Sequence, residues 1–163
     1  MTPGDWDEVH RIFLEGIATG DSTFEANAPE WSHWDSAHLP DHRLVAKAGS
    51  RILGWAALSP VSERCVYSGV AEVSLYVGAE QRGRGIGSAL LAAIITSSEK
   101  AGIWTLQAGV FPENTASLRL VAKHGFRQVG RREKLGKMRH GHLAGAWRDV
   151  ILVERRSTAA GID

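Results

Sequence analysis

The sequence predicts one α/β domain in which a mixed sheet is flanked by helices. Three observations lead to this prediction. The chain has 163 residues, which is enough to close one substantial core. Segments whose apolar residues recur at helical spacing interleave with short β-prone segments. One predicted strand also runs through a glycine-rich turn directly into a helix. The predicted order is therefore helix, two strands, strand, helix, strand, helix and two strands.

The first predicted helix begins at the N-terminus. Thr2 can cap it, Pro3 suits its first position and Asp5 completes a capping-box pattern. Residues 19–40 form a long aromatic connection without clear periodicity, in which we expect only a short helix at 31–37. Connections of this length often contribute to a functional site.

The sheet is expected to begin after this connection. The runs 43–48 and 52–59 are β-prone and are separated by a turn sequence, which indicates a hairpin. Residues 71–77 alternate between apolar and polar side chains, so they should form a third strand. One face of this strand should present Val73, Leu75 and Val77, and the other face Glu72, Ser74 and Tyr76.

The C-terminal half alternates helices and strands. A helix that starts at Ile86 should end at Gly102, and a strand should follow at 105–110. A second helix should run from an Asn114 N-cap to a Gly125 C-cap. Strands at 126–132 and 147–154 complete a single domain over residues 1–156, and we expect 157–163 to be a flexible tail.

Composition restricts the class of function. Apolar residues make up 44% of the chain and charged residues 23%, as in ordinary soluble domains. With 19 Lys and Arg against 18 Asp and Glu, the chain has no net field that would attract nucleic acid or an anionic membrane. The apolar runs are far shorter than the roughly 20 residues that a membrane span needs, and we expect a cytoplasmic protein. Because Cys65 is the single cysteine, no internal disulfide can form.

The turn after the third strand predicts an anion-binding site. Its glycines allow a tight turn and a close approach of the ligand, and the following helix directs free N–H groups towards it. A Walker loop is excluded because the turn contains no lysine. The dinucleotide fingerprint is disfavoured because Ser88 stands where its third glycine should be, and no acidic residue ends the next strand.

The segment Arg82-Gly-Arg-Gly-Ile-Gly87 instead matches Arg/Gln-x-x-Gly-x-Gly/Ala, and here the chain resembles the GCN5-related (GNAT) N-acetyltransferases. The stretch Asn114-x-x-Ser117-x-x-Leu120, followed by Gly125-Phe126, resembles the next helix of that family. The resemblance implies a GNAT fold whose sheet is splayed between the fourth and fifth family strands. The family normally has an edge strand before the first helix, and we expect this sequence to lack that strand.

The same resemblance implies acetyl-CoA as co-substrate and suggests which residues bind it. The pantetheine arm should pair with the backbone of the third strand, and the glycine-rich turn should hold the pyrophosphate. The implied acetyl-CoA-binding residues are Leu75, Tyr76, Val77, Arg82, Gly83, Arg84, Gly85, Ile86, Gly87, Ser88, Asn114 and Ser117.

Within the family the chain most resembles the phosphinothricin and methionine sulfone or sulfoximine acetyltransferases. The matching words are Gly-Ile-Ala-Thr-Gly-Asp-Ser-Thr-Phe24-Glu25, Arg64-Cys-Val-Tyr67, Glu72-Val-Ser and Trp147-Arg-Asp149. This resemblance implies acetylation of the α-amine of a small amino acid, a role in detoxification and a homodimer. It also implies an acceptor site made by Phe24, Arg64, Tyr67, Ser74 and His142.

Glu72 is the candidate general base. An α-amine titrates near ~8 and must lose a proton before it can attack a thioester. Glu72 projects from the strand that should hold the thioester and can accept that proton directly or through water. A backbone N–H of Leu75 or Tyr76 is the expected donor to the oxyanion. His140 and His142 lack a third ligand, so we expect no metal.

Two alternatives for function stay open at this point. Many family members place a general-acid tyrosine where this chain has Val121, so water is the expected proton donor to the leaving thiolate. Val121 also leaves room for a non-catalytic acyl-CoA-binding module. The acceptor could instead be a protein N-terminus or lysine, which would require an open groove in place of a small pocket.

Overall fold

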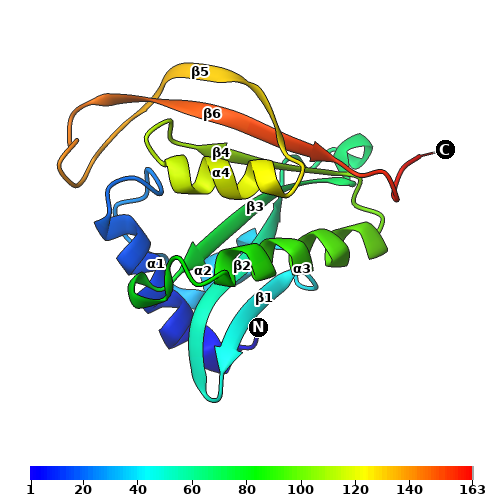
Figure 1. Cartoon of the computed structure of the whole chain (residues 1–163), viewed down its shortest axis with the longest axis horizontal. Helices are drawn as coiled ribbons and strands as arrows, with labels where there is room; N and C mark the ends of the chain where they lie inside the picture. Colours follow the sequence, from blue (N-terminus) through cyan, green and yellow to red (C-terminus); the bar gives the residue numbers. More distant parts are fainter. Residues whose placement is uncertain (163) are drawn as a thin grey trace.

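The computed structural model describes residues 1–162 and has one mixed sheet at its centre (Figure 1). Six strands are arranged in the order β1-β2-β3-β4-β6-β5. The β3–β4 pair is parallel and the other pairs are antiparallel. The strands are β1 (Arg43–Ala48), β2 (Arg51–Pro60), β3 (Val70–Val77), β4 (Thr105–Val110), β5 (Arg127–Lys137) and β6 (Trp147–Arg156).

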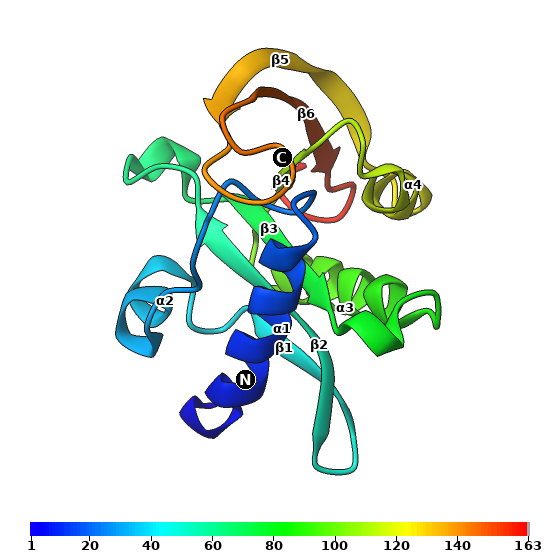
Figure 2. The same ribbon diagram turned by 90° about the vertical axis from the view of Figure 1, so that its left-hand side faces the viewer.

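Helices cover both faces of the sheet. They are α1 (Trp6–Ala18), α2 (Trp31–Ala37), α3 (Ile86–Lys100) and α4 (Thr115–Lys123). In Figure 2, α2 lies to the left of the sheet and α3 and α4 lie to its right. Among residues 1–162, no helix is long and apolar enough to cross a membrane.

Alternation along β2 explains how one strand serves two cores. Ala56 and Leu58 are fully buried in the cluster formed with α3, whereas Trp55 and Ala57 are buried in the cluster formed with α1 and α2. Successive side chains of a strand point to opposite faces, so a strand that is buried on both faces is apolar at nearly every position. The six-residue run from Ile52 to Ala57 has this character.

The two central strands separate soon after they meet. β3 pairs with β4 only at Val70–Thr105, Ala71–Leu106 and Glu72–Gln107, although β3 continues to Val77 and β4 to Val110. β4 remains paired with β6 as far as Val110. The predicted splay between the fourth and fifth family strands is therefore confirmed, and it opens the sheet at the carboxyl ends of β3 and β4.

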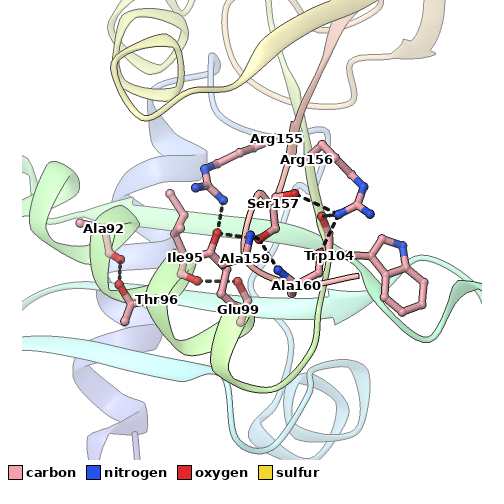
Figure 3. A network of polar contacts seen from close by, with 11 residues as sticks. Ala92, Ile95, Thr96, Glu99, Trp104, Arg155, Arg156, Ser157, Ala159 and Ala160 are labelled. Carbon is pink, nitrogen blue, oxygen red and sulfur yellow. Dashed lines mark hydrogen bonds and ion pairs between the residues drawn. The ribbon is translucent and has the colours of Figure 1, made fainter. Parts of the chain in front are cut away.

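The C-terminal residues are folded back against the end of α3 (Figure 3). Glu99 accepts hydrogen bonds from Arg155 at 2.8 Å and from the Ser157 hydroxyl at 2.8 Å. Ser157 in turn accepts from the backbone N–H groups of Ala159 and Ala160, both at 3.0 Å. The flexible tail over 157–163 stays a prediction, and Asp163 lies outside the described residues.

Most predicted elements are confirmed, with differences at their ends. The capping box is present, since the Thr2 N–H donates to the Asp5 carboxylate at 2.7 Å, but Pro3–Asp5 is a 3-10 turn that leads into α1. No strand precedes α1 among the described residues. β5 extends five residues beyond its predicted end at Arg132, to Lys137. The sequence pattern does not predict this extension, because the pairing is irregular there and a β-bulge breaks the two-residue alternation of side chains.

Candidate functional site

The free edge of β3 presents unpaired backbone groups. The Gly78 N–H donates to the Leu53 carbonyl at 2.9 Å, so Gly78 faces β2. Backbone groups alternate in direction along a strand, and Tyr76 and Ser74 therefore also face β2. Leu75 and Val77 direct their N–H and C=O groups towards the gap left by β4, where the Val77 carbonyl accepts a long hydrogen bond from Arg82 Nε at 3.5 Å. An extended ligand can pair with them as an additional strand. Tyr76, which was also predicted to pair through its backbone, contributes its side chain.

The glycine-rich turn lies beside this edge and lines a cavity of about 590 Å³. Gly83 and Gly85 have φ of 74° and 81°, and a Cβ built on either would meet no protein atom within 4 Å. The turn therefore has the left-handed backbone and the open space that a phosphate cradle requires. Helix α3 begins directly after it at Ile86. These features fit the pyrophosphate of acetyl-CoA.

Charged and polar side chains surround the turn. Arg82 and Arg84 are exposed, and Arg84 donates to the Gln81 side chain at 2.7 Å. The Ser88 hydroxyl lies 2.8 Å from Nε2 of His124, at the end of α4. Burial, together with the nearby Lys123 and Arg155, lowers the pKa of His124, which favours the neutral imidazole.

Asn114 joins the start of α4 to the loop after α1. Its side-chain oxygen accepts from the Ser117 N–H at 3.1 Å, which confirms it as the N-cap. Its amide nitrogen donates to the Asp21 carbonyl, also at 3.1 Å. Asn114 and Ser117 both line the 590 Å³ cavity. The predicted cofactor residues on β3, the glycine-rich turn and α4 are thus brought together, apart from Arg84, which is not in that lining.

A buried arginine fixes the same two loops from β6. The Arg148 side chain is only 3% exposed, and it donates to the Gly20 carbonyl at 2.6 Å and to the carboxylates of Asp21 at 2.9 Å and Glu113 at 2.7 Å. Its guanidinium also lies 3.8 Å from the centre of the Phe111 ring. Arg148 holds the pKa of Glu113 below its usual value. It therefore connects the α1–α2 loop with the β4–α4 loop.

A second cavity, of about 340 Å³, lies on the other side of the gap between β3 and β4. Glu72, the candidate general base, lines it together with Ser74 and Phe24, two of the predicted acceptor-site residues. Glu72 accepts a hydrogen bond from Gln107 Nε2 at 3.0 Å, across the last paired position of β3 and β4. Phe24 packs edge-on against Phe111, with ring centres 4.9 Å apart. This cavity combines one carboxylate with an apolar wall.

The irregular part of β5 turns two side chains into the second cavity. Lys134 has φ of 46°, and the pairing with β6 shifts between Arg132 and Gly136. The Lys134 N–H donates to the Asp149 carboxylate at 2.7 Å, which holds the bulge in place. Arg132 and Leu135, which are three positions apart, would face opposite sides of a regular strand, but here both line the cavity.

The two cavities meet along a shared wall. Tyr76 belongs to both, and its ring packs against Phe13 and Trp55 with centres 4.8 Å away in each case. Burial raises the pKa of Tyr76 to about 12, so the phenol remains neutral over the working range of most enzymes. The other shared residues are Ser22, Leu75, Asn114, Ser117 and Leu120.

Three predicted acceptor-site residues do not line either cavity. Arg64 and Tyr67 lie on the exposed segment before β3, where the guanidinium sits 5.5 Å from the centre of the Tyr67 ring. His142 is exposed on the β5–β6 loop beside Gly20. Their role in acceptor binding stays a prediction. Among residues 1–162, no cluster of three His, Cys, Asp or Glu side chains could hold a metal ion.

Sequence reasoning missed many of the residues that line the second cavity, among them Gln107, Phe111, Arg132 and Leu135. Gln107 and Phe111 lie on and just after β4, and alternation along that strand could have placed Gln107 on the same face as a neighbouring Glu72. No local signal identifies Arg132, because only the bulge and the pairing of β5 with β6 bring it to the cavity.

Comparisons with known proteins agree with this geometry. The family model described as "Acetyltransferase (GNAT) family" matches residues 6–126. An "N-acetyltransferase" of Streptomyces griseus is 32% identical over 138 residues, which are 80% of this chain and 69% of that protein. A "Phosphinothricin N-acetyltransferase" of Alcaligenes faecalis is 31% identical over 160 residues, 93% of this chain and 77% of that protein. Across four curated relatives, the matched segment spans 61% to 77% of their own length.

A solved structure shares the whole fold. A GNAT superfamily phosphinothricin acetyltransferase from Sinorhizobium meliloti, determined in complex with acetyl-CoA, superimposes with a TM-score of 0.87. The superposition covers 100% of this chain and 89% of that chain, at 24% sequence identity. At this identity the likeness concerns the fold, including the central splayed sheet.

Proposed function

Because the chain belongs to the acetyltransferase (GNAT) family, we propose that it acetylates the α-amine of a small amino acid such as phosphinothricin, methionine sulfoximine or methionine sulfone. Family membership makes it an acetyltransferase, and acetyl-CoA is the acetyl donor that GNAT enzymes use. The acceptor class and the mechanism are our inference. The cytoplasmic location, the homodimer and the role in detoxification rest on the resemblance alone and stay predictions.

The observation that supports this proposal best is the junction of the two cavities. A large cavity bounded by a phosphate cradle meets a small one at the free edge of β3, and both reach Leu75 and Tyr76. Such an arrangement allows donor and acceptor to be present together, so that the amine attacks the acetyl group directly in a ternary complex. Holding two reactants in contact lowers the barrier through orientation alone.

Glu72 is the residue best placed to prepare the acceptor amine. It lines the acceptor cavity, and Gln107 restrains its carboxylate by one hydrogen bond at 3.0 Å. A carboxylate can take the ammonium proton directly or through a water molecule. Ser74 shares this face of β3 and can bind the same amine.

Backbone and solvent complete the proposed chemistry. Acetyl-CoA, when bound, supplies the electrophilic thioester carbonyl. Leu75 has a free backbone N–H at the edge of β3, which is the type of donor that stabilises negative charge developing on an oxygen. Val121 lines the acceptor cavity and has no proton to donate, so we propose that water protonates the thiolate leaving group.

The proposal is tested by release of CoA from acetyl-CoA, followed with a thiol-reactive dye. The acceptors are methionine sulfone, methionine sulfoximine, phosphinothricin, a polyamine and a peptide with a free N-terminus. We expect turnover of the three amino acids, because the cavity of about 340 Å³ suits a small molecule. Turnover of the peptide alone would show a protein-modifying enzyme. Binding of acetyl-CoA without turnover of any amine would show a binding module.

A further inference from the structure

The acceptor cavity contains one fixed charge of each sign. Among the described residues that line it, Glu72 and Arg132 are the only acidic and basic side chains. The remaining lining is polar but uncharged, or apolar, as with Phe24 and Leu135. An amino acid has one ammonium and one anionic group, so this pair of charges matches both ends of such a ligand.

Arg132 differs from the other two arginines of β5 in having no ion-pair partner among the described residues. Arg127 pairs with Glu154, and Arg131 pairs with Asp149 at 2.6 Å. Both of those carboxylates belong to β6. Arg132 lies opposite Val150, which is buried and lines the acceptor cavity. Its guanidinium therefore has its hydrogen-bonding capacity available for a ligand.

The backbone around Arg132 is held in place by specific contacts. Asp149 accepts from the Arg131 guanidinium and from the Lys134 N–H, so it clamps the bulge on both sides of Arg132. Gly136 lies directly beneath Phe24, since a Cβ built there would come within 2.8 Å of that ring. The bulge thus presents Arg132 from one wall of the cavity while β3 presents Glu72 from another.

We propose that Arg132 binds the anionic group of the acceptor, which is either the α-carboxylate or a tetrahedral oxyanion on the side chain. The inference deepens the proposed function and rests on it. It replaces Arg64 as the main cationic contact, because Arg64 lies outside the cavity beside Tyr67, whereas Arg132, although also exposed, lines the cavity. A guanidinium suits either oxyanion, since its planar donors match both carboxylate and phosphinate geometry.

The test uses acceptors that separate the two anionic groups. The only anionic group of methionine sulfone is its carboxylate, and the decarboxylated analogue of methionine sulfone has no anionic group. Phosphinothricin has both groups, and its decarboxylated analogue keeps only the phosphinate. Turnover is measured for wild type, Arg132→Gln, Arg132→Lys, Arg64→Gln and the matched control Arg127→Gln. Arg127 lies on the same strand, away from the bulge, and its replacement removes the same charge outside the cavity.

We expect Arg132→Gln to raise KM for methionine sulfone about tenfold or more, since one charge-assisted contact is lost. The kcat and the KM for acetyl-CoA should remain within about twofold, and Arg132→Lys should recover part of the loss. The amine without an anion should be unaffected. A penalty for the decarboxylated phosphinothricin analogue, with none for methionine sulfone, would assign Arg132 to the phosphinate instead of the carboxylate.

Two kinds of result would overturn the inference. An equal loss of turnover with all four acceptors would give Arg132 a structural role. Loss of anion selectivity in Arg64→Gln alone would assign the anion contact to Arg64. Acceptor binding in the presence of CoA, measured by calorimetry, separates the inference from the proposed function. Methionine sulfone that binds to wild type and not to Arg132→Gln supports the anion site even if no amine is acetylated. Equal binding to both proteins of methionine sulfone and also of decarboxylated phosphinothricin refutes it whatever the turnover.

Discussion

The two cavities that meet at β3 are built in different ways. The larger one is built around a continuous segment, from the end of β3 through the glycine-rich turn into α3, which offers backbone groups and glycine conformations, and α1, the loop after it and α4 complete its wall. The smaller one is assembled from side chains on the α1–α2 loop, β3, β4, β5 and β6. Backbone contacts suit an acetyl donor that all members of a family share, because these contacts do not depend on the side chains. Side-chain contacts suit an acceptor that differs between members, because side chains can be substituted one at a time.

This contrast predicts that single side-chain changes in the smaller cavity affect chemistry most. We expect Glu72→Gln to lower kcat about a hundredfold or more at neutral pH, the usual range for loss of a general base. The loss should shrink at high pH, where the amine is already deprotonated. A pH–rate profile measures both effects.

The control for this change is Glu80→Gln, which removes a carboxylate that is 79% exposed and does not line either cavity. Its profile should match that of the wild type. If Glu72→Gln lowers the rate by one factor at every pH, then Glu72 does not act as the base, and the smaller cavity would serve only for binding.

Arg148→Met should break the link between the α1–α2 loop and the β4–α4 loop, both of which line the two cavities. The guanidinium is buried and pairs with two carboxylates. Removing one partner of a buried ion pair usually costs ~3–5 kcal/mol. Asp21 and Glu113 are 38% and 59% exposed and can be rehydrated, so we expect a loss of about 2 kcal/mol in the free energy of unfolding. Urea denaturation measures this change, and KM should rise for both substrates.

Arg127→Met provides the comparison, because Arg127 forms an ion pair on the same sheet but is 68% exposed. Surface pairs of this kind contribute little, so its unfolding free energy should change by less than about 1 kcal/mol. Equal losses in the two variants would mean that Arg148 has no special role in joining the loops.

Gly85→Ala tests the backbone character of the larger cavity. The Cβ would project into the space that the turn leaves open, and we expect KM for acetyl-CoA to rise about tenfold with KM for the acceptor unchanged. Gly49→Ala has the same left-handed strain, with φ of 60° and no neighbour within 4 Å, in the β1–β2 turn. Both variants should lose similar stability, about 1–2 kcal/mol, whereas Gly49→Ala should bind acetyl-CoA normally. An unchanged KM in Gly85→Ala would place the phosphates elsewhere.

The smallest expected effect concerns the shared wall. The chain has two tyrosines, so in Tyr67→Phe the ultraviolet titration reports Tyr76 alone. Burial raises the pKa of Tyr76 to about 12, so ionisation should be complete only beyond that pH in the folded protein. Because the unfolded phenol ionises near ~10, stability should decline as the pH rises from about 10 towards 12. A midpoint near 10 would mean that water from the cavities reaches the phenol.

The same contrast explains what could be predicted from the sequence. The glycine-rich turn, the Asn114 cap and the alternation of β3 are local patterns, and the structure places them together as expected. The fold and the splay followed from those patterns and the family resemblance. The acceptor cavity depends on pairing between segments far apart in the chain, such as β5 with β6. Glu72, Ser74 and Phe24 were identified, but Arg132 and Leu135 were not, because alternation fails at the bulge.

The bulge in β5 has a consequence for how such a site can diverge. Arg131 and Arg132 are neighbours, yet one is neutralised by Asp149 and the other faces the cavity. A slip of one residue in an edge strand exchanges the side chains on its two faces. Insertion or deletion of a single codon near Lys134 would therefore replace the set of side chains that meets the acceptor, without altering the strands that bind the donor. Length variation in this strand offers evolution a way to change acceptor preference separately from point substitution.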